Sequence, residues 1–67
     1  MLFKIGDKVK IHSTNSTLDG QTGEVKGISE YYLVNDYIIL LVLDNLVEGY
    51  DPAIIIIGSC LESVSGI

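Results

Sequence analysis

Few side chains of this chain could take part in chemistry, and their types and spacing do not form a catalytic set. The 67 residues contain one histidine, His12, and one cysteine, Cys60. The hydroxyls Ser13 and Thr14 follow His12, but nucleophilic catalysis needs a third group that orients the base, and the sequence shows none. Free cysteine is among the most buried residue types, so we expect Cys60 to fill a small place in the core. We therefore predict no catalytic residues and a protein that is not an enzyme.

Side chains that bind metals are equally sparse. A zinc site needs about four ligands, and the chain has only Cys60 and His12 as sulfur and nitrogen donors. Asp44, Glu48 and Asp51 lie in one predicted loop and carry the oxygen ligands that hard cations prefer. Their spacing is not that of a calcium-binding loop, and solvated loop charges explain them more simply. We expect no metal and no cofactor.

A polar loop over residues 13–22 is the segment that could hold a small ligand. Hydroxyls, amides and glycines are dense there, and successive backbone N–H groups can form a concavity for an anion. The glycine spacing matches neither a phosphate-binding loop nor a dinucleotide loop, so turn chemistry is the favoured interpretation. Ligand capture remains an alternative, and it would use Ser16, Thr17, Asp19, Gly20, Gln21, Thr22 and Gly23.

β-Strands are the elements that must position these residues. Apolar residues alternate with polar ones from Phe3 to Ile11, which is the period of a strand with one wet face. The same period places His12 on the polar side. Further strands are predicted over residues 24–30, 37–43 and 53–57, followed by a 3₁₀ turn over 58–61 and a last short strand around 63–64. Residues 31–36 are ambiguous, and residues 44–51 form a loop.

Glycines mark the irregular points of these strands. Gly20 and Gly23, three residues apart before a β-type run, suit a turn with positive φ, which glycine adopts at little cost. Gly27 lies inside a predicted strand and indicates a bulge or a bend. The fold class is therefore all-β, and the length allows a single domain over residues 1–67.

Two of the predicted strands are apolar on both faces. A sheet with one wet face shows alternation, whereas residues 37–43 and 53–57 do not. One parity fills the core, either Ile39 with Leu41 or Ile38 with Leu40 and Val42, and the other needs cover. A chain of this size has a thin core, and an uncovered apolar face invites association. We expect a homo-oligomer, most simply a dimer, with an interface that contains Tyr37, Ile39, Leu41, Ile54 and Ile56.

The charge of the chain argues against nucleic acid as a partner. Four lysines and no arginine stand against nine carboxylates, which gives a formal net charge of −5. Binding to a duplex depends on several cationic contacts that release counterions. No apolar window approaches the ~20 residues that a membrane-spanning helix needs, and no signal-peptide pattern is visible. We expect a cytoplasmic protein without membrane contact.

The glycine-punctuated opening of the chain resembles a known family. Phe3-x-Ile5-Gly6-Asp7-x-Val9-x-Ile11, followed by Leu18-Asp19-Gly20-x-x-Gly23-x-Val25, is similar to the start of a KOW-type, or more broadly SH3-like, small barrel. The resemblance spans nearly the whole chain and implies a barrel of about five strands with a 3₁₀ turn. KOW-type modules serve ribosomal proteins and transcription factors, so it also implies an RNA- or ribosome-associated module as an alternative function. The acidic charge and the lack of arginine depart from the basic character of that family.

A second likeness concerns the whole pattern, including residues 16–20 and Cys60-Leu61-Glu62. It is similar to small proteins of tailed bacteriophages, and this implies a location in the host cytoplasm and a host protein as partner, such as a defence component. The leading hypothesis is a small acidic binding module, without enzymatic activity, that self-associates and binds or inhibits a host protein. Small-molecule or nucleotide capture is the other alternative.

Overall fold

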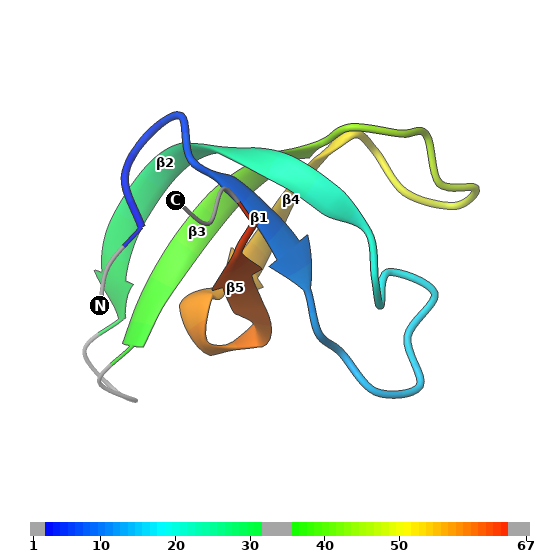
Figure 1. Cartoon of the computed structure of the whole chain (residues 1–67), viewed down its shortest axis with the longest axis horizontal. Coiled ribbons are helices and arrows are strands. Elements are labelled where there is room, and N and C mark those ends of the chain that lie inside the picture. The colour runs from blue at the N-terminus through cyan, green and yellow to red at the C-terminus, as the bar shows by residue number, and fades with distance from the viewer. Residues whose placement is uncertain (1–2, 32–35, 65–67) are drawn as a thin grey trace.

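Five antiparallel strands and one 3₁₀ turn make up the structure, which is a computed structural model that describes residues 3–31 and 36–64 (Figure 1). The spatial order of the strands is β4-β3-β2-β1-β5. The predicted all-β fold class, with about five strands and one 3₁₀ turn, is confirmed. The elements are β1 (Lys8–Ile11), β2 (Thr22–Tyr31), β3 (Asp36–Leu43), β4 (Ala53–Ile57), η1 (Gly58–Cys60) and β5 (Leu61–Ser63).

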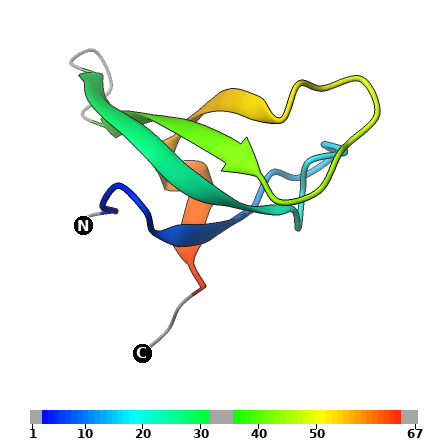
Figure 2. The same cartoon turned by 90° about the horizontal axis from the view of Figure 1, so that it is seen from above.

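A bulge in β2 helps the sheet to curl around its own core. The register between β2 and β3 shifts between Val25 and Gly27, so Lys26 is the extra residue. Such a bulge bends its strand and increases the local twist. In Figure 2, β4 lies on one side of the interior and β1 lies on the other. The bulge predicted at Gly27 is confirmed.

The first strand is shorter than its alternating pattern predicts. A turn precedes it, in which the Asp7 N–H donates to the Lys4 carbonyl at 3.0 Å and Gly6 has a φ of 97°. Gly6 and Asp7 still exchange backbone hydrogen bonds with Val25, but the regular ladder with β2 begins at Lys8. The other predicted strands agree with the observed bounds to within two residues, and residues 32–35, which lie in the ambiguous segment, are outside the described residues.

The two glycines at positions 20 and 23 have different roles. Gly20 has a φ of 86° and ends the polar loop, as predicted. Gly23 has no positive φ; it lies in β2 in register with Val9 and Leu43, and it is buried. A Cβ at Gly23 would lie 2.6 Å from the Val42 carbonyl oxygen. The prediction of a turn at Gly23 is wrong, because what this position requires is close approach of two strand backbones.

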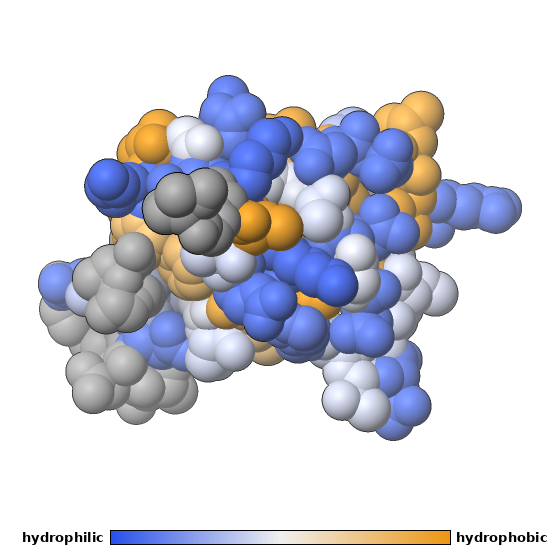
Figure 3. Space-filling model, in the orientation of Figure 1, coloured by the Kyte–Doolittle hydropathy of each residue, from blue (hydrophilic) through white to orange (hydrophobic). Residues whose placement is uncertain are grey.

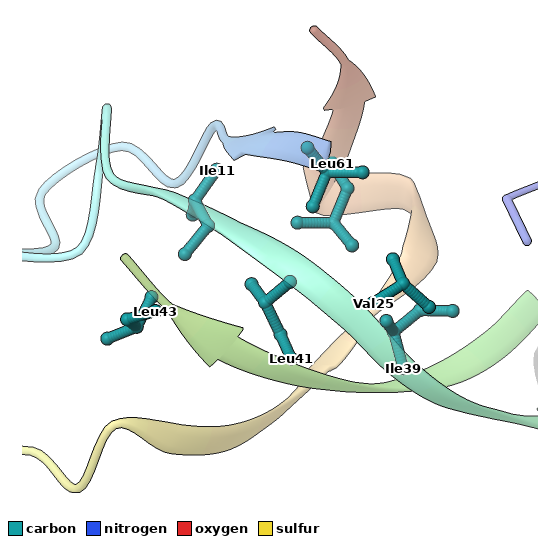
Figure 4. Close-up of a cluster of buried hydrophobic side chains, with 7 residues drawn as sticks. Ile11, Val25, Ile39, Leu41, Leu43 and Leu61 are labelled. Atoms are coloured by element: carbon teal, nitrogen blue, oxygen red, sulfur yellow. The ribbon is translucent and has the colours of Figure 1, made fainter. Parts of the chain in front are cut away.

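The core consists of the inner side chains of β1, β2, β3 and β5. Burial alternates along β3, where Ile39 and Leu41 are buried and Leu40 between them is exposed. Figure 4 shows side chains of the four strands pointing into one interior. The buried cluster comprises Val9, Ile11, Val25, Ile39, Leu41, Leu43 and Leu61.

We predict that Leu41→Ala costs about 2–5 kcal/mol of unfolding free energy, because it deletes a fully buried side chain and leaves a cavity. A domain of this length has only about 3–10 kcal/mol in total, so Ile39→Val, at about 0.5–1.5 kcal/mol, gives a graded test. Leu46→Ala is the control, since Leu46 is 86% exposed. Urea unfolding followed by circular dichroism measures all three. Equal midpoints for Leu41→Ala and Leu46→Ala would contradict this core.

Gly23→Ala should destabilise the chain by about 1–3 kcal/mol, because its methyl group meets backbone that cannot move aside alone. Gly27→Ala is the matched control in the same strand. Its Cβ would lie 3.3 Å from the Leu40 Cβ, a contact that a small shift relieves, so we expect a change below about 1 kcal/mol. The same urea titration separates the two variants, and a more stable Gly23→Ala protein would refute the close approach.

Candidate protein-binding surface

The structure determines which parity of β3 and β4 faces the core. Ile39 and Leu41 are buried, and Tyr37, Ile54 and Ile56 are partly buried and pack against the core. The interface predicted at these five residues therefore has to be corrected, because Ile39 and Leu41 have no exposed surface to offer and the other three already pack inward. The open alternative, with Ile38, Leu40 and Val42 on the outside, is the observed one.

Side chains of the opposite parity form an apolar surface on the outside of β3 and β4, which we call the outer face. The register pairs Leu40 with Ile55 and Ile38 with Ile57, and directly opposed residues of an antiparallel pair share one side of the sheet. Leu40 is 40% exposed and Ile55 is 72% exposed. The outer face comprises Ile38, Leu40, Val42, Ala53, Ile55 and Ile57.

A shallow hollow of about 270 Å³ lies on this face. Gly27 is in register with Leu40, and because Gly27 has no side chain, the surface is depressed beside Leu40. The residues that line the hollow carry no charge, and a single serine supplies the polar side chain; they are Gly27, Ile28, Ser29, Ile38, Leu40 and Ile55. An uncharged hollow lined by branched aliphatic side chains suits an apolar side chain of another protein.

Charged residues lie around the outer face rather than on it. Glu24 is in register with Val42, and the Lys26 Nζ atom lies 3.2 Å from its carboxylate. Figure 3, which views the molecule from the side of β1, shows a mostly hydrophilic surface with scattered apolar residues. The net charge of −5 is therefore carried by other surfaces of the molecule.

A polar cluster ties β1 and β2 to the loop that follows β3. The Lys8 Nζ atom lies 2.6 Å from the Asp44 carboxylate, and the Thr22 hydroxyl donates to the other carboxylate oxygen at 2.8 Å. These two hydrogen bonds, that from Lys8 first, lower the pKa of Asp44, and the same bond from Lys8 raises the pKa of the lysine. The raised pKa favours the charged form of Lys8, so this lysine serves here as one partner of an ion pair and not as a nucleophile.

A second carboxylate fastens the start of β3. The Asp36 side chain accepts a hydrogen bond from the Tyr37 N–H at 2.7 Å, and this bond, together with bonds from Ser59, lowers the pKa of Asp36. Ser59 belongs to η1, so Asp36 connects β3 with the turn between β4 and β5.

The polar loop at residues 13–22 uses many of its donors internally. The Ser13 N–H donates to the Asp19 carboxylate at 2.9 Å, and the Leu18 N–H donates to the Ser16 hydroxyl at 3.0 Å. Further backbone bonds engage the N–H groups of Ser16, Asp19, Gly20 and Gln21. Since the Asp19 carboxylate occupies the position that an anion would take at Ser13, the geometry of the loop does not favour anion capture.

The remaining candidate side chains are dispersed. His12 is exposed, and its Nε2 atom lies 2.8 Å from a Glu62 carboxylate oxygen. Cys60 is half-buried rather than a full member of the core. Within the described part of the chain, no three His, Cys, Asp or Glu side chains gather closely enough to hold a metal ion. In residues 3–31 and 36–64, no helix is long and apolar enough to cross a membrane.

Comparison with known proteins yields no matching protein family, no matching curated protein and no matching solved structure. The surface must therefore be interpreted from its own geometry.

Acid should weaken the fold through Asp36 and Asp44. Their pKa values are lowered below 3.8 in the folded chain, so their stabilisation is complete above 3.8 and is lost as the pH falls through the folded-state values. We expect a constant urea midpoint between about pH 7 and about pH 5 and a decline below about pH 4.

The variant Asp44→Asn should lower the midpoint at neutral pH and reduce the decline in acid, because it removes one of the two groups. Asp51→Asn, in the loop that follows β3, is the control and should keep the wild-type profile. If Asp44→Asn and the wild type had identical profiles of urea midpoint against pH, the hydrogen bonds of Asp44 with Lys8 and Thr22 would contribute nothing to stability.

Proposed function

We propose that this chain is a protein-binding module without enzymatic activity, and that the outer face of β3 and β4 is its binding surface. The observation that carries the proposal is the continuous, uncharged set of aliphatic side chains on the outside of a sheet whose inside already forms a complete core. Exposed apolar patches of this kind mark surfaces where proteins associate.

The composition of the face fits a protein ligand better than a nucleic acid. Of the four lysines, Lys8 and Lys26 are engaged by the carboxylates of Asp44 and Glu24, and the outer face itself has no cation that could contact a phosphate. A protein surface, in contrast, can place an aliphatic or aromatic side chain in the hollow beside Leu40. Such buried anchors supply most of the binding energy of an interface.

The class of partner follows from the phage likeness and from the charge. A host protein of a bacterium is the first target to test, and the acidic remainder of the surface would steer the module toward a partner with a basic rim. Self-association through the same apolar face is the other form of protein binding that the surface supports.

The test compares capture of proteins from bacterial lysate by the wild type and by the double variant Ile38→Thr/Leu40→Thr. Threonine keeps the β-propensity of this central strand while it removes the apolar surface. For a protein that the wild type captures, we expect the double variant to bind at least about 30-fold more weakly, which corresponds to about 2 kcal/mol at a central anchor.

Leu46→Thr serves as the matched control, because Leu46 is an exposed leucine in the loop between β3 and β4 and lies outside the outer face. It should retain full binding. The proposal fails if the wild type neither self-associates nor captures a specific protein, or if the double variant retains whatever association the wild type shows.

A further inference from the structure

β4 is an edge strand with one unpaired side. The Leu43 N–H donates to the Pro52 carbonyl at 2.8 Å, and hydrogen-bonded pairs alternate along an antiparallel ladder. Ile54 and Ile56 therefore direct their backbone groups toward β3, whereas Ala53, Ile55 and Ile57 direct theirs away from it. Among the described residues, no strand other than β3 pairs with β4.

This edge lacks the features that normally prevent edge-to-edge pairing. Such edges are protected by charged residues, internal prolines or bulges. β4 contains only alanine and isoleucine, its register with β3 is continuous, and the proline that precedes it lies outside the strand. At its centre, Ile55 is 72% exposed. The edge therefore presents an apolar strand with free donors and acceptors.

We propose that β4 pairs with β4 of a second copy of this chain, antiparallel and about a twofold axis at Ile55. The proposal rests on the proposed function, because the edge of β4 borders the outer face and the pairing would extend that face across two copies. In this register Ile55 faces Ile55 of the second copy, and Ala53 faces Ile57. Because Ile57 is also the N-cap of η1, whose first i→i+3 bond uses its carbonyl, the remaining free groups of these three residues form about four hydrogen bonds between the copies.

The sequence of β4 favours a second copy as the occupant of this edge. A twofold interface must be self-complementary, so that residue i meets residue j and residue j meets residue i. Ala-Ile-Ile-Ile-Ile reads almost the same in both directions, and every cross-strand pair in the register is apolar. A shift by two residues would leave one of the free-edge residues unpaired in each copy.

Charge does not oppose this pairing, although each chain has a net charge of −5. Asp51 lies two residues before β4 and outside the paired segment. The two Asp51 residues are separated by about eight strand positions, or roughly 27 Å. Because the screening length is about 8 Å at physiological salt, their repulsion is small.

Pairing would also change the surface that is offered to other proteins. The outer faces of both copies would lie on the same side of one continuous sheet, next to each other across the twofold axis. The hollows beside Leu40 would then form a twofold pair. A partner with two equivalent sites, or one long apolar ridge, would fit such a surface.

Native mass spectrometry and sedimentation of the untagged wild type test the pairing. We expect a species of twice the 7.3 kDa chain mass. Ile55→Lys should raise the dissociation constant at least about tenfold, because it places two like charges directly opposite each other. Leu46→Lys makes the same change of charge at an exposed leucine away from β4 and should leave the dimer intact.

A mixture supplies the test of register. Ile55→Lys and Ile55→Glu chains, one of them labelled with ¹⁵N, should each be monomeric alone and should form a mixed dimer together, because only this register brings position 55 against itself.

Hydrogen exchange in the wild type gives a readout that does not depend on a variant. Dilution should expose the amide of Ile55 while the amide of Ile54, which bonds to β3, stays protected.

Several results would overturn the pairing. A wild type that stays monomeric, a dimer that tolerates Ile55→Lys, or the absence of a mixed dimer would each do so. None of them decides the proposed function, which depends on Ile38 and Leu40 of the central strand. A dimer that survives Ile55→Lys but dissociates with Ile38→Thr/Leu40→Thr would refute edge pairing and keep the outer face as the binding surface.

Discussion

The structure depends on the packing of the inner side chains of β3 against β1, β2 and β5. Ile39 and Leu41 lie at the centre of the seven-residue buried cluster, and the bare backbone of Gly23 lets β2 approach β3 closely beside them. The described residues, 3–31 and 36–64, form one sheet and one 3₁₀ turn and supply no second layer over the outer face. The interior that stabilises the fold therefore leaves the opposite side of β3 and β4 exposed. Stability and binding surface are two consequences of one strand that is apolar on both sides.

The bulge at Lys26 affects both the core and the outer face of the sheet. Without the extra residue, the two-residue period would put Val25 and Ile28 on opposite faces of β2. With it, Val25 pairs with Leu41 and is fully buried, whereas Ile28 pairs with Ile39 but stays 38% exposed. The same shift sets Gly27 against Leu40 on the outer face, which opens the hollow there. A single inserted residue thus bends the sheet around its core and shapes the surface outside it.

Much of the architecture could be predicted from sequence, because its signals are local. Alternation, β-branched runs, glycines and Pro52 located most strand ends to within two residues. The parity of β3 could not be predicted, because Ile38 to Leu43 are all apolar and parity is decided by pairing with distant strands. The same reason explains the error at Gly23, whose constraint is the Val42 carbonyl of another strand rather than its own turn. Predictions of interfaces are affected most, because an error of one residue in the register of a strand exchanges its core side chains with its surface side chains.

An unprotected apolar edge and an apolar outer face are difficult to explain as separate accidents in so acidic a chain. Charged residues are abundant in this sequence, and a single lysine in β4 would protect the edge at little cost to the core, because Ile55 contributes almost nothing to the interior. Instead, none of the nine carboxylates lies in β4: five lie in loops and turns, and the other four lie in β2, β3 and β5. This distribution is what association through β3 and β4 requires: a neutral, self-matching strand surrounded by charge that discourages contact everywhere else. Negative charge on the rest of the molecule and its absence from β4 therefore act together, the first to limit nonspecific contact and the second to permit the specific one.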